Sequence, residues 1–103
     1  MGKYLAGVDV GTTGARCMIF DLEGNIIGGD YREYGCIYPK PGWVDQDAEY
    51  LVSQTMEACK AAIADAGVDA KEIASVGFST QRSVTTPVDK EGKPVRPMIS
   101  WQD

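Results

Sequence analysis

The stretch that most constrains the fold runs from Tyr4 to Asp21, with the sequence YLAGVDVGTTGARCMIFD. Residues 4–10 and 15–20 are short apolar runs, and turn residues bound both of them. Short apolar runs between turn signals are typical of buried strands. Because only Gly-Thr-Thr-Gly separates the two runs, the sequence predicts a tight antiparallel hairpin.

The connection Gly11-Thr12-Thr13-Gly14 has the composition of an anion-binding turn. Glycine allows a positive φ and lets the backbone approach a ligand closely. Successive N–H groups in such a turn form a concave nest for an anion, and the threonine hydroxyls add donors. We therefore predict that residues 11–14 hold a phosphate group.

Two charged residues flank this turn, Asp9 at the end of the first strand and Arg16 near the start of the second. A carboxylate repels a phosphate unless a cation lies between them, and Mg²⁺ is commonly bound by carboxylate, phosphate and water together. The guanidinium of Arg16 is suited to contact a phosphate oxygen. The alternative is an ordinary hairpin turn with Asp9 and Arg16 as a solvated charge pair.

Composition indicates a soluble globular domain and argues against several kinds of partner. The 103 residues suit one small domain, and the contents of 44% apolar and 24% charged residues are ordinary for such a domain. A net charge of −5 without a Lys/Arg cluster argues against nucleic acid. Because there is neither an apolar run of transmembrane length nor a secretory signal, we expect a cytoplasmic protein without a membrane partner.

The cysteines are scattered at positions 17, 36 and 59, and the chain has no histidine. This combination argues against a structural zinc site. Cys17 falls in an apolar strand and Cys59 on an apolar helix face, so we expect both to be reduced core residues. Cys36 falls in a loop, where partial exposure is expected.

A third strand is predicted over residues 26–33, and it completes an antiparallel meander. Gly28 and Gly29 within it indicate a bulge or a close backbone approach. A loop over residues 35–46 follows.

A helix is predicted over residues 48–66, with Asp47 as its N-cap and Gly67 as its stop. Apolar residues recur along it at helical spacing. This predicted core stripe consists of Val52, Met56, Cys59, Ile63 and Ala66.

The next strand is predicted over residues 74–80 and should run parallel to a meander strand, because a helix connects them. Such strands present ligand residues just beyond their carboxyl ends. Those residues are Gln81, Arg82 and Ser83. An edge hairpin is then expected, with strands over 84–88 and 95–101, since prolines confine these segments to a sheet edge.

The pattern Asp-x-Gly-Thr-Thr after a buried strand resembles the first phosphate loop of the actin, heat-shock-70 and sugar-kinase superfamily. Further motifs follow in order: GWVDQD at 42–47, GFSTQR at 77–82, Asp89 with Gly92-Lys93-Pro94, and ISWQD at 99–103. The ordered set resembles the N-terminus of the FGGY carbohydrate kinases, the glycerol kinase and xylulokinase family, over essentially the whole chain.

This resemblance implies an α/β fold of the ribonuclease-H-like class, in a two-domain enzyme that transfers the γ-phosphoryl group of ATP to a sugar or polyol hydroxyl with Mg²⁺. It assigns Mg²⁺ to Asp9 and the phosphates to Thr12, Thr13, Arg16 and the turn amides. It places Gln81, Arg82, Ser83 and Trp101 at the sugar pocket.

The resemblance does not select the sugar. Glycerol kinases carry Arg-Glu where this chain has Arg82-Ser83, and xylulokinases carry Met-His at a position where this chain offers no histidine. Neither glycerol nor xylulose is therefore the expected substrate.

In this family the catalytic base and the adenosine pocket lie beyond residue 103. We therefore expect residues 1–103 to be the N-terminal part of the first domain and to be inactive alone. An open sheet edge should promote homo-oligomers or domain swapping. The alternatives are a nucleotide-binding assembly or chaperone module of the actin and heat-shock-70 type, and a stable but inert fragment.

Overall fold

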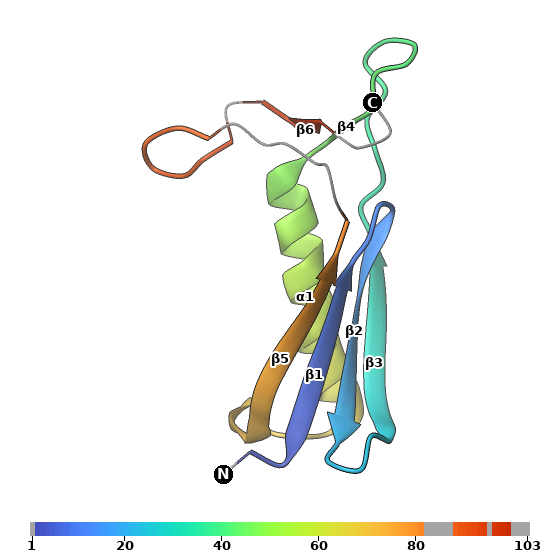
Figure 1. Cartoon of the computed structure of the whole chain (residues 1–103), viewed down its shortest axis with the longest axis vertical. Coiled ribbons are helices and arrows are strands. Elements are labelled where there is room, and N and C mark those ends of the chain that lie inside the picture. Colours follow the sequence, from blue (N-terminus) through green and yellow to red (C-terminus); the bar gives the residue numbers. More distant parts are fainter. Residues whose placement is uncertain (1, 82–87, 95, 100–103) are drawn as a thin grey trace.

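The computed structural model describes residues 2–81, 88–94 and 96–99. Three strands, β1 (Tyr4–Val10), β2 (Gly14–Asp21) and β3 (Ile26–Glu33), form the predicted antiparallel meander. The strand β5 (Ile73–Thr80) pairs with β1 in parallel, as predicted. The sheet order is therefore β3-β2-β1-β5, and one helix, α1 (Ala48–Ala66), lies along one face (Figure 1).

Helix α1 begins and ends at the predicted residues. Asp47 Oδ1 accepts a hydrogen bond from the Tyr50 N–H at 3.0 Å, which is an N-cap interaction. Gly67 has a left-handed backbone with φ of +70°, and its N–H donates to the carbonyls of Ile63 and Ala64. A short 3₁₀ turn, η1 (Ala70–Glu72), then leads into β5. No helix in the described part of the chain is long and apolar enough to cross a membrane.

The predicted core stripe of α1 is partly correct, because Cys59, Ile63 and Ala66 pack against the core, whereas Val52 and Met56 are mostly exposed. The buried helix residues are Leu51, Thr55, Ala58 and Ala62, whereas Val52 and Met56 are 58% and 54% exposed. The physical reason is close packing: helix residues without bulk at the contact let α1 lie directly over β2 and β3. Thr55 is tolerated in this face because its hydroxyl donates to the Leu51 carbonyl at 2.8 Å.

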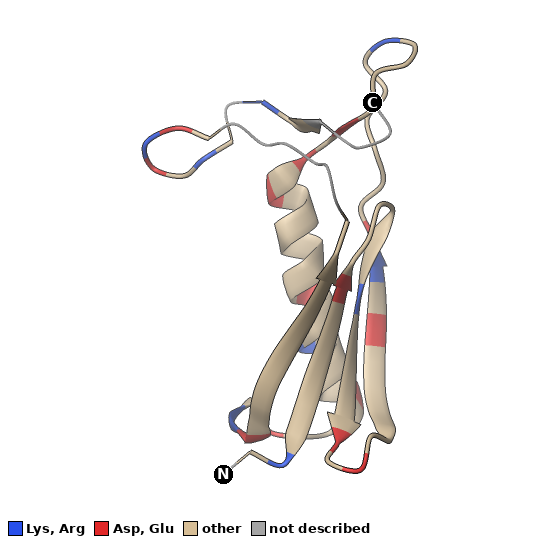
Figure 2. Ribbon diagram, in the orientation of Figure 1, with Lys and Arg blue, Asp and Glu red and all other residues tan. Residues whose placement is uncertain are grey.

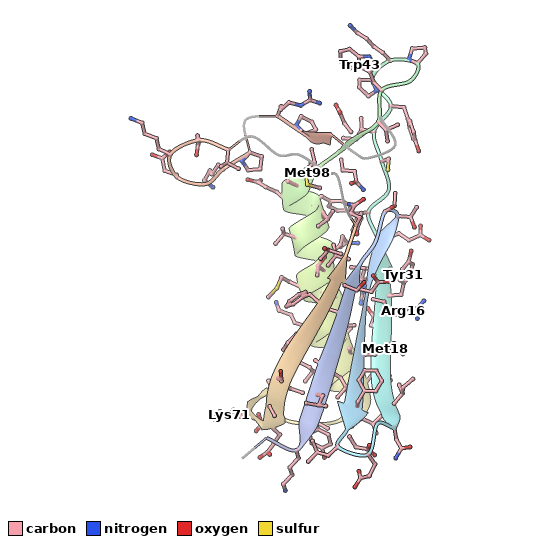
Figure 3. The ribbon with its side chains drawn as sticks, in the orientation of Figure 1. Arg16, Met18, Tyr31, Trp43, Lys71 and Met98 are labelled. Atoms are coloured by element: carbon pink, nitrogen blue, oxygen red, sulfur yellow. The ribbon has the colours of Figure 1, made fainter. Side chains whose placement is uncertain are left out.

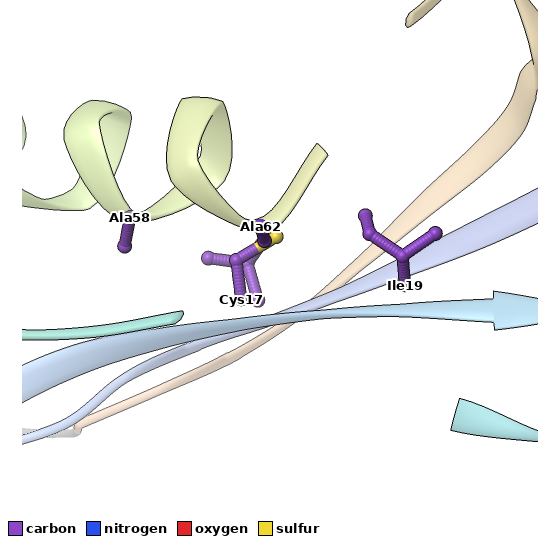
Figure 4. Packing of buried hydrophobic residues seen from close by; sticks show 5 residues of the cluster. Cys17, Ile19, Ala58 and Ala62 are labelled. Atoms are coloured by element: carbon purple, nitrogen blue, oxygen red, sulfur yellow. The ribbon is translucent and has the colours of Figure 1, made fainter. Parts of the chain in front are cut away.

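The core between sheet and helix is small and built from both layers. Figure 4 shows Ala58 and Ala62 of α1 above Cys17 and Ile19 of β2. Cys17 is 1% exposed, which confirms it as a core residue, and burial and the neighbouring Cys59 raise the pKa of its thiol to about 12. Cys59 and Cys36 are both half-buried, and none of the three forms a disulfide.

Both interpretations of Gly28 and Gly29 are confirmed. The β2–β3 register shifts between Ile19 and Phe20, so β3 carries a bulge at this point. A Cβ on Gly28 would lie 2.5 Å from the backbone nitrogen of Ala66. The helix can therefore approach β3 this closely only because residue 28 has no side chain.

The expected edge hairpin is tested only in part, because residues 84–87, 95, 100 and 101 lie outside the described residues. Its turn is present, since the Asp89 N–H donates to the Lys93 carbonyl at 2.8 Å, and Val88 and Pro94 form a single bridge. The strand β6 (Met98–Ile99), however, pairs with β4 (Asp45–Gln46) in a separate two-stranded sheet. β4 lies in the segment expected to be a loop. An ion pair supports this ladder, with Arg96 Nη2 2.6 Å from Asp45 Oδ1.

Candidate phosphate-binding site

The turn between β1 and β2 is held in place by Tyr34, just after β3. The Tyr34 hydroxyl contacts the Gly11 carbonyl closely and lies 3.1 Å from the Gly14 carbonyl. The N–H groups of Tyr34 and Gly35 both donate to the Thr13 carbonyl, at 2.9 and 3.1 Å. Burial, with the neighbouring Tyr31 and Asp9, raises the pKa of Tyr34 to about 12, so its hydroxyl stays protonated at neutral pH.

The remaining carbonyl of the turn is held by Gln46 of β4. Gln46 is 1% exposed, and its Nε2 donates to the Thr12 carbonyl at 2.7 Å. All four carbonyls of residues 11–14 thus contact donors, since the Gly14 carbonyl also accepts from the Gly11 N–H at 3.0 Å. In a trans peptide the N–H points opposite to the preceding C=O. The N–H groups of residues 12–14 are therefore directed away from the segment that binds the carbonyls.

The two turn glycines have a different role from the one predicted. The described glycines with positive φ are Gly24, Gly35, Gly42, Gly67 and Gly92, so neither Gly11 nor Gly14 needs a left-handed backbone. The predicted close approach to a ligand is not tested, but the structure shows a close approach of Gly14 to its own chain. A Cβ on Gly14 would lie 2.5 Å from the Tyr31 hydroxyl and 2.6 Å from the Arg32 carbonyl. The tightly packed turn is what requires glycine here.

Asp9 and Arg16 lie opposite each other on β1 and β2, on the sheet face that α1 does not cover. Arg16 extends over the Tyr31 ring of β3, 5.0 Å from its centroid, and Figure 3 labels both residues near the turn end of the sheet. The paired Gly7 and Gly77 leave the neighbouring part of this face without side chains. A shallow hollow of about 380 Å³ results, with Asp9 and Arg16 in its lining.

The predicted sugar-side residues are only partly described. Gln81 follows β5, and its backbone N–H donates to the Val10 carbonyl at 2.9 Å, so it lies directly beside the end of β1. Its side chain donates from Nε2 to Gln46 Oε1 at 2.8 Å. Arg82, Ser83 and Trp101 lie outside the described residues, and their predicted role at the sugar pocket is not tested.

No group of three or more His, Cys, Asp or Glu side chains capable of holding a metal is present among the described residues. A fully protein-bound metal is therefore not indicated in this part of the chain. The donor set at the turn instead fits an ion carried in with phosphate, since Mg²⁺ often uses one or two carboxylates and fills its other positions with phosphate and water. Asp9 is the exposed carboxylate beside the turn.

Tyr34 and Gln46 were missed by the sequence analysis. Both lie in or beside a segment rich in Pro and Gly, for which no periodic pattern predicts contacts. Gln46 belongs to the GWVDQD motif, so the sequence did give a signal for this region, but not for the contact. Their partners in the turn are 20 to 34 positions away in the chain.

A family model matches residues 4–103, described as the FGGY family of carbohydrate kinases, N-terminal domain. The chain belongs to the FGGY family of carbohydrate kinases. This membership favours the kinase interpretation over the actin-type or chaperone-type module. It also confirms the fold class, as an FGGY N-terminal region with a mixed α/β sheet.

Individual relatives agree with this assignment. A glycerol kinase from Roseiflexus sp. (strain RS-1) is 46% identical over 104 residues, which cover 100% of this chain and 21% of the relative. A glycerol kinase from Haloferax volcanii is 40% identical, over 97% of this chain and 20% of the relative. The chain thus spans about a fifth of the length of the curated relatives it matches.

Solved structures show the same fold. A xyloylose kinase from Brucella ovis superposes with a TM-score of 0.90 at 30% identity, over 97% of this chain and 21% of the other. The glycerol kinase of Plasmodium falciparum, solved with ADP, gives a TM-score of 0.80 at 23% identity, over 97% and 20%. The latter similarity is evidence for the fold alone.

Proposed function

We propose that this chain supplies the phosphate-binding part of an ATP-dependent kinase that phosphorylates a hydroxyl group of a sugar or polyol. One observation carries the proposal: the carbonyls of Gly11, Thr12 and Thr13 each contact donors of residues 34–46, which directs the N–H groups of residues 12–14 away from that segment. Such an array of N–H groups suits phosphate oxygens. Family membership supplies the reaction class.

Each charged residue at the turn has a proposed role toward Mg-ATP. Asp9 would hold Mg²⁺, directly or through water, and Arg16 would face a phosphate oxygen. The hydroxyls of Thr12 and Thr13 would add donors to the phosphates. Bound Mg-ATP supplies the phosphoryl group, and the cation offsets its negative charge.

The acceptor side of the reaction is proposed for the segment that follows β5. Gln81, Arg82, Ser83 and Trp101 would contact the sugar or polyol. The Arg82 guanidinium can donate two hydrogen bonds to neighbouring hydroxyls. The curated relatives named above are glycerol kinases, but Ser83 replaces the glutamate expected of that group, so we keep the substrate as a polyol or sugar.

Nucleotide binding can be tested on the purified chain by ¹H–¹⁵N NMR titration with Mg-ADP. We expect shifts at the amides of residues 12–14 that require Mg²⁺ and that disappear in Asp9→Asn. Glu23→Gln is the matched control, since it removes the same charge at the opposite end of β2. Shifts spread evenly over the chain, or unaffected by Asp9→Asn, would contradict the assignment of this turn.

Phosphoryl transfer needs a longer protein, because it requires an oriented nucleophile as well as bound phosphate. We expect no polyol-dependent ADP release from the chain alone. A chimera that carries this chain in place of the first fifth of the Roseiflexus glycerol kinase should phosphorylate at least one polyol. In that chimera Asp9→Asn should lower kcat by roughly 10²–10³-fold. A folded chimera inactive toward a full polyol panel would overturn the proposal.

Self-association through β5 is a second, separate proposal for the isolated chain, with a further copy as the partner. β5 is uncharged (Figure 2), and Val76 and Phe78 are 47% and 68% exposed. A bare edge of this kind pairs readily with another strand. Light scattering should give a mass above 11.1 kDa that rises with concentration, and Val76→Lys should reduce it. A monomer at all concentrations would contradict this proposal.

We also propose a cytoplasmic location, where ATP is available to a kinase. A tagged full-length gene product recovered from the soluble cytoplasmic fraction would support it, and recovery from the medium or an envelope fraction would contradict it.

A further inference from the structure

Gln46 is the largest fully buried polar side chain among the described residues, and it lies between the two proposed halves of the site. Its Nε2 donates to the Thr12 carbonyl at 2.7 Å and to the Gly35 carbonyl at 3.4 Å. Its Oε1 accepts from Gln81 Nε2 at 2.8 Å. One amide thus contacts both the phosphate turn and the residue that follows β5.

These contacts fix the orientation of both amides. A backbone carbonyl only accepts hydrogen bonds, so the nitrogen of Gln46 must face Thr12 and Gly35. Its oxygen then faces Gln81, which must present its own nitrogen. Gln81 Oε1 is left as a buried acceptor without a hydrogen-bond partner in the described part of the chain. A buried acceptor without a donor is costly, and a ligand hydroxyl is a suitable donor.

The segment that carries Gln46 is itself held firmly. Asp45 and Gln46 form β4, which is paired with β6 and supported by the Arg96–Asp45 ion pair. A shift of the Gln46 amide toward Gln81 would therefore weaken its hydrogen bond to the Thr12 carbonyl, and the reverse also holds. A change in the position of Gln81 must be met by a change at Gln46, and so at the Thr12 carbonyl.

We propose that Gln46 is a positioning residue that couples the phosphate turn to the acceptor side of the site. This inference rests on the proposed function and extends it. A polyol hydroxyl that donates to Gln81 Oε1 fixes the Gln81 amide. The hydrogen bonds from Gln81 to Gln46 and from Gln46 to the Thr12 carbonyl then restrict the turn. Binding of the polyol and of the nucleotide phosphates is therefore linked in free energy, and each favours the other.

The coupling can be tested in the purified chain without any ligand. Amide hydrogen exchange is measured at Gly11, Tyr34 and Gly35, whose N–H groups donate to carbonyls of the turn, in the wild type, Gln81→Ala, Gln46→Leu and the double variant. We expect Gln81→Ala to accelerate exchange in the turn by about tenfold, which corresponds to one hydrogen bond. In the Gln46→Leu background the same change should have no further effect on the turn.

Asn25→Leu is the matched control, because the Asn25 side-chain amide also donates one hydrogen bond, to Asp21 Oδ2 at 2.9 Å, but at the opposite end of β2. It should leave exchange at Gly11, Tyr34 and Gly35 unchanged and preserve the response to Gln81→Ala. Gln46→Glu keeps the side-chain volume and the acceptor for Gln81 but loses the donor to Thr12, so it should also abolish the response. It serves as the second variant if Gln46→Leu does not fold.

An equal effect of Gln81→Ala on the turn with and without the Gln46 amide would overturn the coupling. Amide exchange that stays at the wild-type rate in both Gln46→Leu and Gln46→Glu would also overturn it. The outcome is separate from that of the Mg-ADP titration, because the exchange experiment contains no nucleotide. Failure of nucleotide binding with intact coupling would refute the proposed function alone, and the reverse result would refute only the role of Gln46.

Discussion

The two turns that flank β2 are stabilised in opposite ways. The turn after β2 is held by its own residues: Asp21 Oδ1 accepts from the N–H groups of Glu23 and Asn25, at 3.0 and 2.8 Å. Gly24 there has a left-handed backbone with φ of +87°. The turn before β2 is held by Tyr34 and Gln46, which lie 20 to 34 positions from their partners in the chain.

The difference shows how a turn becomes suited to a ligand. In the turn after β2 the N–H groups of residues 23–25 donate within the turn itself, with that of Gly24 reaching the Asp21 carbonyl at 3.1 Å. These N–H groups therefore already have hydrogen-bond acceptors within the turn. In the turn before β2 the distant segment binds the carbonyls instead, and the intervening N–H groups point away from it. Support of the turn by a distant segment, and not by the N–H groups of residues 12–14, supports the phosphate site that we propose there.

The largest expected contrast is between Gly14→Ala and Gly24→Ala. A Cβ on Gly14 meets the Tyr31 hydroxyl and the Arg32 backbone, so we expect a loss of about 2–3 kcal/mol in unfolding free energy. A Cβ on Gly24 meets nothing within 4 Å, and only the left-handed backbone opposes it, at about 1 kcal/mol. Urea unfolding followed by circular dichroism measures both.

Gly14→Ala should therefore lower the unfolding free energy more than Gly24→Ala does. If Gly24→Ala were the more destabilising, local backbone conformation rather than close packing would dominate at both turns. Equal effects would also contradict the distinction, because the two glycines are required for different physical reasons.

The same difference explains how far the sequence could predict the fold. Asp47 and Gly67 mark the helix ends through contacts within a few residues, and β1, β2 and β3 follow from short apolar runs, so these predictions are confirmed. The predicted stripe placed Cys59, Ile63 and Ala66 correctly at the core. It missed Ala58 and Ala62, because these alanines contribute little apolar character to a pattern. Their small size, which the pattern does not weigh, decides the packing.

At the candidate site the sequence predicted the turn but not the residues that support it. Gly11 and Gly14 were correctly placed in a tight turn, although the proposed positive φ was wrong. The contacts of Tyr34 and Gln46 depend on how the segment after β3 folds back over the meander. No local pattern encodes that path, and the two-residue strand β4 is too short to show alternation.

A smaller contrast is expected between Tyr34→Phe and Asp21→Ala. Tyr34→Phe leaves the carbonyls of Gly11 and Gly14 without the hydroxyl, at about 1–2 kcal/mol, and should weaken Mg-ADP binding at the turn. Asp21→Ala removes contacts that water replaces, because the site is exposed, and should leave Mg-ADP binding unchanged. Paired urea unfolding and NMR titration separate stability from binding. Weaker binding in Asp21→Ala alone would reverse the comparison.

The two turns should also lose stability at opposite ends of the pH scale. The pKa of Asp21 is lowered from 3.8, chiefly by the hydrogen bond from the Asn25 side chain, so its contribution is present above that pH and is lost as the pH falls below it. The pKa of Tyr34 is raised from 10.0 to about 12 by burial, so its contribution is lost as the pH rises through that interval. Amide exchange should accelerate, beyond the intrinsic pH effect, at residues 23–25 at low pH and at Gly11, Tyr34 and Gly35 at high pH.

The alkaline response needs a control, because the raised pKa of Cys17 also destabilises the folded state as the pH rises from 9.0 to about 12. Cys17→Ala should remove that global component and leave the local effect at Gly11, Tyr34 and Gly35. Tyr34→Phe should remove the local effect. An alkaline response at the turn that survives Tyr34→Phe would show that another group is responsible.

The smallest expected effect concerns Arg16, which lies over the Tyr31 ring close to the turn before β2. Tyr31→Phe keeps the ring under the guanidinium, whereas Tyr31→Leu removes it and should cost about 0.5–1 kcal/mol. Because the ring also limits where the guanidinium lies, Tyr31→Leu should weaken Mg-ADP binding slightly and Tyr31→Phe should not. Both variants lose the hydroxyl near Thr13, 3.4 Å away, so a difference between them isolates the ring. Identical affinities would mean that Arg16 needs no support from β3 to reach a phosphate.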